Sequence, residues 1–221
     1  MIKKDTLSFL DDLQKNNNRE WFQANKSLYE KARRDVEALV QQLIHATAQF
    51  DPENGLPDPK KCVFRIYRDV RFSTDKSPYK TNFGAIIGYN KSGYYLHISP
   101  DECFLACGYY MLTPDQLRKL RKGIYDYFDE FQQIINTPAF RTEIGDLQRD
   151  EDTLQRVPNE FDKSHPAAEY MKLKRFYVMK SFSEKQLLSD NFAAYATEIF
   201  RIMQPIKHFL YNLLDFTSEH H

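Results

Sequence analysis

The spacing of apolar residues changes along the chain, and this constrains the fold more than any other feature of the sequence. Up to about residue 50 apolar residues recur every three or four positions, as in Leu7, Leu10 and Leu13, which is typical of amphipathic helices. From Cys62 to about residue 110 they alternate with polar residues, which is typical of half-buried strands. Helical spacing returns from Leu117 onward. The sequence therefore predicts an α+β fold, with helices at both ends of a central sheet.

The central region divides into four predicted strands, over residues 62–72, 81–89, 94–99 and 103–109. Asn90–Gly93 and Pro100–Glu102 are rich in turn-forming residues and join the later strands directly. Because such short connections join antiparallel neighbours, we expect an antiparallel β-meander over about 62–110. A later alternating run predicts one more strand at about 173–179.

Long helices at the N- and C-termini are expected to pack this sheet. Asn17 followed by Glu20 predicts a capping box for a helix that runs to about Gln49. Thr113 followed by Gln116 predicts another helix start. The chain is then expected to be a single domain over 1–221: helical over 1–50, sheet over 62–110, helical over 114–140, and strand plus C-terminal helices over 166–216.

Composition limits the classes of function. The 221 residues include 31 basic and 31 acidic side chains, and a net charge of zero argues against a protein that binds polyanions with its whole surface. No apolar run is long enough to span a membrane, and the N-terminal residues lack the pattern of a signal peptide. Three cysteines without a paired motif favour a reducing, cytoplasmic setting.

Metal and cofactor motifs are missing from the sequence. The six histidines and three cysteines form no ligand cluster with metal-site spacing, and no glycine-rich phosphate loop is present. We therefore predict no metal and no cofactor. The sequence does not indicate an oligomeric state.

The most unusual chemistry lies in residues 65–82, RIYRDVRFSTDKSPYKTN, called here the basic segment. Five basic residues against two acidic ones give it a local excess of three positive charges. Arg68 falls where alternation places an apolar residue. Since a guanidinium does not lose its proton, Arg68 needs carboxylates, carbonyls or a bound anion to offset its desolvation.

Three functions remain open for this segment. In the first, the protein binds a small phosphorylated or other anionic ligand; the candidate ligand-binding residues are Arg65, Arg68, Arg71, Lys76, Tyr79 and Lys80. In the second, it is a hydrolase or transferase in which Asp69 or Asp75 acts as a general base beside Arg71 and Lys76. In the third, the ion pairs are structural and the function lies in binding a partner.

Nucleic acid is a less favoured partner. Further basic residues are Arg118, Lys119, Arg121 and Lys122 in the helix after Thr113, and Lys172, Lys174 and Arg175 near the last strand. We interpret the first group as the solvated side of an amphipathic helix, because Leu117, Leu120 and Ile124 form its apolar stripe. The zero net charge also weighs against a nucleic-acid groove.

The pattern Arg65-x-x-Arg68-Asp69-x-Arg71-Phe72-x-x-Asp75-Lys76-x-x-Tyr79 resembles the signature of the DUF2461 family. Residues 9–30 and 95–110, and the PDQLRKLR run that follows, are also similar to that family. The chain departs from it at Ala106-Cys107, where a glycine-rich pair is expected before Gly108. The resemblance supports a single domain and singles out the basic segment, but it implies no activity, because the family is defined without one.

Overall fold

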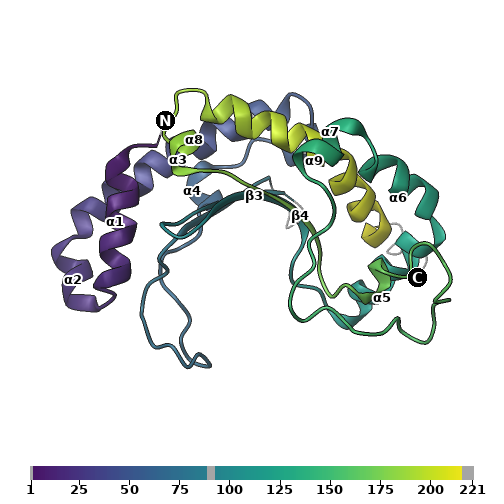
Figure 1. Ribbon diagram of the computed structural model, residues 1–221. Coiled ribbons are helices and arrows are strands. Elements are labelled where there is room, and N and C mark those ends of the chain that lie inside the picture. The colour runs from purple at the N-terminus through teal and green to yellow at the C-terminus, as the bar shows by residue number, and fades with distance from the viewer. Residues whose placement is uncertain (1, 89–92, 216–221) are drawn as a thin grey trace. The chain divides into compact units, whose positions relative to one another are not determined.

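The computed structural model describes residues 2–88 and 93–215 and confirms the α+β fold (Figure 1). Within these residues the strands form one four-stranded antiparallel sheet with the order β1-β2-β3-β4. The chain divides into two compact units. The first contains residues up to Leu105 and Ser181–Glu198, and the second contains Ala106–Lys180 and the residues from Ile199 on.

The long helix α3 (Lys26–Ala48) is the helix against which several other elements of the first unit pack. The unit contains α1 (Lys4–Lys15), α2 (Arg19–Ala24), α3 (Lys26–Ala48), the short 3-10 helix η1 (Pro52–Asn54), α4 (Pro59–Cys62) and α8 (Glu184–Leu187). Helix α3 packs against α1, α4 and the first strand. Its buried stripe, which includes Val36, Leu39 and Leu43, recurs at the helical spacing found in the sequence.

The predicted continuous helix from Asn17 to Gln49 is wrong in two respects. The N-cap of α2 is Asn18, whose Oδ1 accepts a 2.9 Å hydrogen bond from Trp21 N, so Asn17 is not the capping residue. The helix is also interrupted at Asn25, which ends α2 and precedes α3. Both differences leave Asn17 in the connection between α1 and α2, with its side chain available for another contact.

Strands β1 (Phe83–Ile87), β2 (Tyr94–Ile98) and β3 (Cys103–Tyr109) follow one another along the chain. In the β1–β2 pair, Phe83 is opposite Ile98 and Ile87 is opposite Tyr94. Every second residue is buried and those between are half-buried over most of β1 and β2, which agrees with the predicted alternation. Tyr89 and most of the predicted turn at Asn90–Gly93 lie outside the described residues.

The second unit contains α5 (Pro114–Asp126), α6 (Phe128–Ile135), α7 (Pro138–Glu143), the 3-10 helix η2 (Tyr170–Lys172), most of β4 (Phe176–Ser181) and the later part of α9 (Phe192–Asp215). The predicted capping box of Thr113 and Gln116 is confirmed at the start of α5. The prediction that Arg121 is solvated is wrong: it is buried, and its Nη2 donates to Leu173 O at 2.8 Å.

Candidate functional site

The first part of the basic segment lies beside β1 as an irregular hairpin. Val63, just before the segment, bridges Ala85 of β1, and Tyr67 bridges Tyr79. Between these bridges one arm advances four residues (63 to 67) and the other six (79 to 85), so two extra residues interrupt the ladder. The prediction of a regular strand over 62–72 is therefore wrong, and the described sheet begins at β1.

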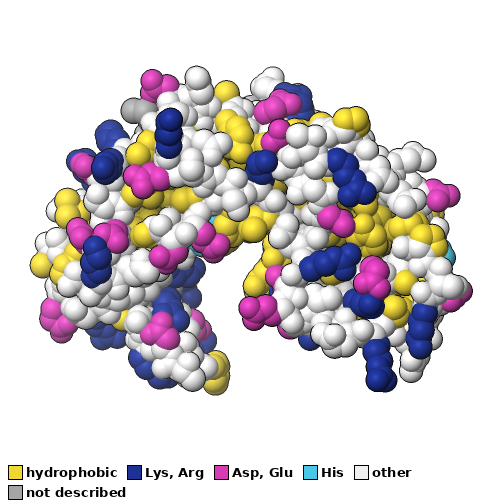
Figure 2. Space-filling view, viewed as in Figure 1, with side chains coloured by type: hydrophobic (Ala, Val, Ile, Leu, Met, Phe, Trp, Pro, Cys, Tyr) yellow, Lys and Arg dark blue, Asp and Glu magenta, His cyan; other side chains and the backbone are white. Residues whose placement is uncertain are grey.

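Because the alternation is lost, the apolar face predicted for 62–72 is lost too. Ile66 is buried, but Phe64 is 38% exposed and Phe72 is 97% exposed. Residues 69–77 form a loop that extends away from the strands (Figure 1). In the space-filling view basic side chains gather over this part of the molecule, with acidic ones between them (Figure 2).

Two ion pairs hold this loop together. The Arg71 guanidinium binds Asp69 with two hydrogen bonds, Nε to Oδ1 at 2.9 Å and Nη2 to Oδ2 at 2.6 Å. The Arg68 guanidinium pairs with Asp75 across the base of the loop. Lys76 Nζ donates to Val70 O at 3.0 Å. Asp75 thus supplies the anionic partner that the sequence predicts Arg68 to need.

These contacts decide the protonation of both candidate catalytic carboxylates. Hydrogen bonds from Arg71, first from its side chain and then from its backbone, lower the pKa of Asp69. The hydrogen bond from Arg68, reinforced by Ser77, holds the pKa of Asp75 well below its usual range. Both carboxylates are therefore anionic near neutral pH, and both are weak bases.

Tyr79 fastens the segment to the helices. Its ring is buried and stacks on Phe22 of α2, with ring centroids 3.9 Å apart. Its backbone pairs with the side chain of Asn17: Tyr79 N donates to Asn17 Oδ1 at 3.1 Å, and Asn17 Nδ2 donates to Tyr79 O at 3.0 Å. The amide of Asn17 thus satisfies the backbone of Tyr79 as a neighbouring strand would.

A pocket of about 420 Å³ lies where the segment meets the end of α1, entirely within the first unit. Its lining is almost wholly polar: Gln14, Asn17, Arg68, Asp75, Ser77, Tyr79, Lys80, Thr81 and Asn82. The only carboxylate in this lining is that of Asp75, which Arg68 and the Ser77 N–H already occupy. The remaining groups include amides and hydroxyls that can donate hydrogen bonds to a ligand.

Lys80 is a cation of this pocket that forms no ion pair within the described residues. It is half-buried, and its Nζ lies 5.4 Å from the centroid of the Phe64 ring. Burial, and then the positive charge of Arg65, lower the pKa of the ammonium group. Among the described residues no carboxylate forms an ion pair with Lys80. A half-buried cation next to a second cation favours the approach of an anion.

The structure separates the predicted ligand-binding residues into two groups. Arg68, Tyr79 and Lys80 line the pocket, with the exposed Arg65 close enough to affect Lys80. Arg71 and Lys76 do not line it, and their side chains donate hydrogen bonds within the loop, to Asp69 and to Val70 O.

Several pocket residues are not among those that the sequence predicts. Gln14 belongs to the last turn of α1 and Asn17 to the connection that follows it, about fifty residues before the segment. No local spacing signals such a contact. Thr81 and Asn82 end the basic segment, but they carry no charge, so counting charges does not identify them.

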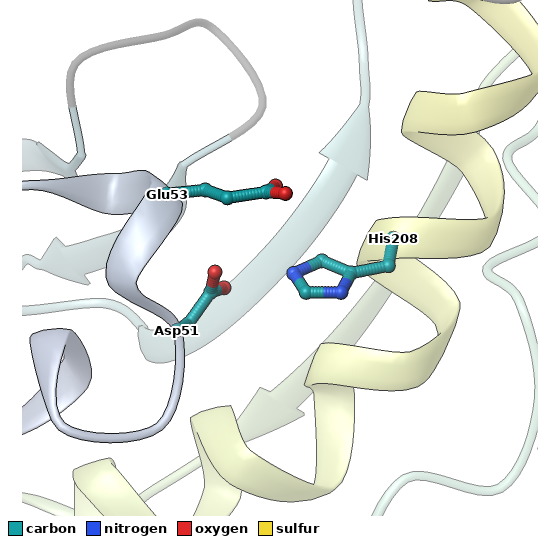
Figure 3. Close-up of side chains that lie close together, drawn as sticks. All are labelled: Asp51, Glu53 and His208. Carbon is teal, nitrogen blue, oxygen red and sulfur yellow. The ribbon is translucent and has the colours of Figure 1, made fainter.

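A separate pair of acidic residues lies on η1 and its cap. Asp51 and Glu53 extend their carboxylates to the same side of this turn, as Figure 3 shows. Asp51 is buried, and its Oδ2 accepts a 2.8 Å hydrogen bond from Tyr94 Oη, which ties the turn to β2. His208, also drawn in Figure 3, belongs to α9 in the second unit.

Comparison with known proteins supports the family resemblance that the motif of the basic segment indicates. In the described part of the chain no helix is long and apolar enough to cross a membrane. No curated protein and no solved structure matches the chain. One family does match, described as a conserved hypothetical protein, DUF2461, and the match covers residues 5–209. Since this range includes both the pocket and nearly all of the described fold, the chain belongs to the DUF2461 family.

Proposed function

We propose that the protein binds a small ligand with a phosphate or carboxylate group in the pocket beside the basic segment. The observation that carries this proposal is the half-buried Lys80 in the pocket lining, whose ammonium has no carboxylate partner among the described residues. Such a group is costly to desolvate unless an anion compensates it. A ligand oxygen would supply that compensation.

The rest of the pocket fits the same ligand. Arg68 presents a guanidinium that Asp75 does not fully occupy, because one carboxylate satisfies only part of its five N–H donors. Asn17 and Thr81 add neutral hydrogen-bonding groups, and Arg65 contributes positive charge nearby. A volume of about 420 Å³ is within the usual range of small-molecule sites.

The predicted residues then have different roles. Lys80 and Arg68 bind the anion, while the buried ring of Tyr79 supports the pocket wall. Arg71 and Lys76 keep the loop in shape through Asp69 and the Val70 carbonyl. This assignment is narrower than the six ligand-binding residues that the sequence predicts.

Binding is favoured over catalysis by the state of the two carboxylates. A general base works best when its pKa lies near the pH of the reaction. The pKa values of Asp69 and Asp75 are lowered by Arg71 and Arg68, which moves both groups away from that optimum. The hydrolase or transferase alternative therefore has less physical support than anion binding.

Titration of the protein with inorganic phosphate, followed by calorimetry, tests the proposal. We expect the parent to bind and Lys80→Met to bind at least about 10-fold more weakly, because a charge-assisted hydrogen bond contributes roughly 1.5–3 kcal/mol. Lys61→Met is the matched control: it removes the same charge from an exposed lysine of α4 that does not line the pocket.

Two outcomes contradict the proposal. The first is a parent protein that binds neither phosphate nor acetate. The second is equal loss of affinity in Lys80→Met and Lys61→Met, which would show that only the overall charge matters. Either result would favour the remaining alternative, in which the Arg68–Asp75 and Arg71–Asp69 pairs are a structural network.

A further inference from the structure

The strands of the first unit present aromatic side chains on the face opposite their buried residues. Tyr95 and His97 alternate with buried residues on β2, and Phe104 does so on β3. The rings of His97 and Phe104 stack, with centroids 4.6 Å apart and planes only 5° from parallel. Tyr95 Oη lies 3.0 Å from His97 Nδ1. These half-buried side chains make a connected aromatic surface.

Phe64 extends this surface to the basic segment. Its ring centroid is 6.1 Å from that of Tyr95, and both rings lie across Gly84 of β1. A Cβ at Gly84 would be 2.7 Å from Tyr95 Oη and 3.2 Å from the Phe64 ring, so the absence of a side chain there allows this packing. At 38% exposure, the Phe64 ring is the most accessible part of the aromatic surface.

The aromatic surface and the anion pocket meet at one residue. Lys80 lines the pocket, and its Nζ lies 5.4 Å from the Phe64 centroid. This is near the outer limit of a cation–π contact, so the ammonium is held only weakly over the ring. One small molecule could therefore place an anionic group at Lys80 and a planar ring on Phe64.

We propose that the ligand of the pocket is a phosphate monoester carrying a planar aromatic ring, of the nucleoside monophosphate class. This rests on the proposed anion binding and adds the second half of the ligand. Its phosphate pairs with Lys80 and Arg68, and its base stacks on the ring of the partly exposed Phe64. Stacking on an aromatic side chain accepts any base, because every base has a π-face.

A free nucleotide fits the chain better than a polymer does. The net charge is zero, whereas binding to a nucleic-acid backbone is carried by many basic contacts. The pocket has a volume of about 420 Å³. Among the described residues its lining contains two cations, Lys80 and Arg68, and the carboxylate of Asp75 offsets one of these charges. Such a site has room and charge for one phosphate group.

Calorimetric titration with adenosine monophosphate and with ribose phosphate separates the two halves of the ligand. We expect the full-length protein to bind adenosine monophosphate about 10-fold more tightly, because stacking of one base contributes a factor of roughly 5 to 150. Phe64→Leu should remove this preference and leave the affinity for ribose phosphate unchanged. Phe72→Leu is the matched control, since Phe72 is 97% exposed on the loop.

Each of the other outcomes contradicts one part of the proposed ligand or of its placement. Equal affinity for adenosine monophosphate and ribose phosphate, with binding of both compounds lost in Lys80→Met, would refute the stacking on Phe64 and leave the proposed anion binding intact. A preference for adenosine monophosphate that survives Phe64→Leu would place the base elsewhere and refute the assignment to Phe64. Binding of neither compound would refute both proposals. Tighter binding of an oligothymidylate, with affinity that falls steeply with salt, would replace the mononucleotide by a polymer.

Discussion

Replacing Asn17 with alanine tests whether one side-chain amide fastens the basic segment to the helices. Asn17 lies in the connection between α1 and α2, and its amide makes both a donor and an acceptor contact with the backbone of Tyr79. The two residues are 62 positions apart in the chain. Alanine removes both contacts and leaves the N–H and C=O of Tyr79 without these partners.

The expected loss of stability follows from the two hydrogen bonds. Each contributes about 0.5–1.5 kcal/mol, and a buried group left unsatisfied costs about 1–3 kcal/mol. Because Asn17 is half-buried, water can replace only part of what is lost. We expect Asn17→Ala to lower the free energy of unfolding by about 2–3 kcal/mol, and the melting temperature by about 4–12 °C for a chain of this length.

The chain supplies its own controls in the neighbouring asparagines. Asn18 caps α2 by accepting one hydrogen bond from Trp21 N, so Asn18→Ala should cost about 1 kcal/mol. Asn16 is exposed and its side chain donates one hydrogen bond to Asp12 O, so Asn16→Ala should change stability by no more than about 0.5 kcal/mol. Thermal unfolding followed by circular dichroism measures all three. If Asn17→Ala melts no lower than Asn16→Ala, the bridge to Tyr79 does not stabilise the protein.

Two further predictions concern pH and backbone geometry. The hydrogen bond from Arg68 lowers the pKa of Asp75 in the folded protein. The pair therefore stabilises the protein above the unfolded pKa of about 3.9 and loses this effect as pH falls below that value. In urea unfolding, the free energy of unfolding should fall less steeply with acid in Asp75→Asn than in the parent. Gly108 has a φ of 115°, and a Cβ there would lie 2.3 Å from Phe176 O, whereas Gly145, with a φ of 91°, has no atom within 4 Å of that position. Gly145→Ala should cost about 1–2 kcal/mol for its backbone conformation alone, and Gly108→Ala clearly more; equal melting temperatures would contradict the steric argument.

The geometry at Gly108 also shows why the departure from the family pattern just before it is tolerated. Ala106 and Cys107 stand where a glycine-rich pair is expected, and both are buried without strain, since the described residues with positive φ are all glycines and neither position is among them. Gly108 is the position at which β3 approaches β4 too closely for a side chain. The substitution before Gly108 therefore leaves the strand pairing possible.

Most of the fold could be predicted from periodicity because burial on one face is a local, repeated property of helices and strands. The α+β class, the strands at Phe83–Ile87, Tyr94–Ile98 and Cys103–Tyr109, and the cap at Thr113 all follow from such patterns. The region 62–72 failed because alternation describes a regular ladder, and the extra residues opposite Val63–Tyr67 break it. An insertion on the partner arm has no signature in the strand that it disrupts.

The role of Asn17 could not be predicted for a different reason. Capping is a local interaction, so Asn17 followed by Glu20 matches its sequence signature. The structure uses the next asparagine for the cap and directs Asn17 to a backbone far along the chain. All three consecutive asparagines are of a type favoured at an N-cap, and Asn17 alone has a glutamate three positions later. The contact to Tyr79, whose ring packs on Phe22, is distant in the chain and has no local signature.

The site itself could be predicted as a segment but not as a pocket. Charge counting finds an excess of three positive charges over residues 65–82, yet it assigns that excess to no residue in particular. In the structure Asp69 and Asp75 neutralise Arg71 and Arg68, and Lys76 bonds to a carbonyl in the loop. The charge that remains near the sheet is on Arg65 and Lys80, where burial lowers the pKa of the Lys80 ammonium. The ion pairs neutralise the charge within the loop, so the positive charge that remains lies beside the pocket and Phe64.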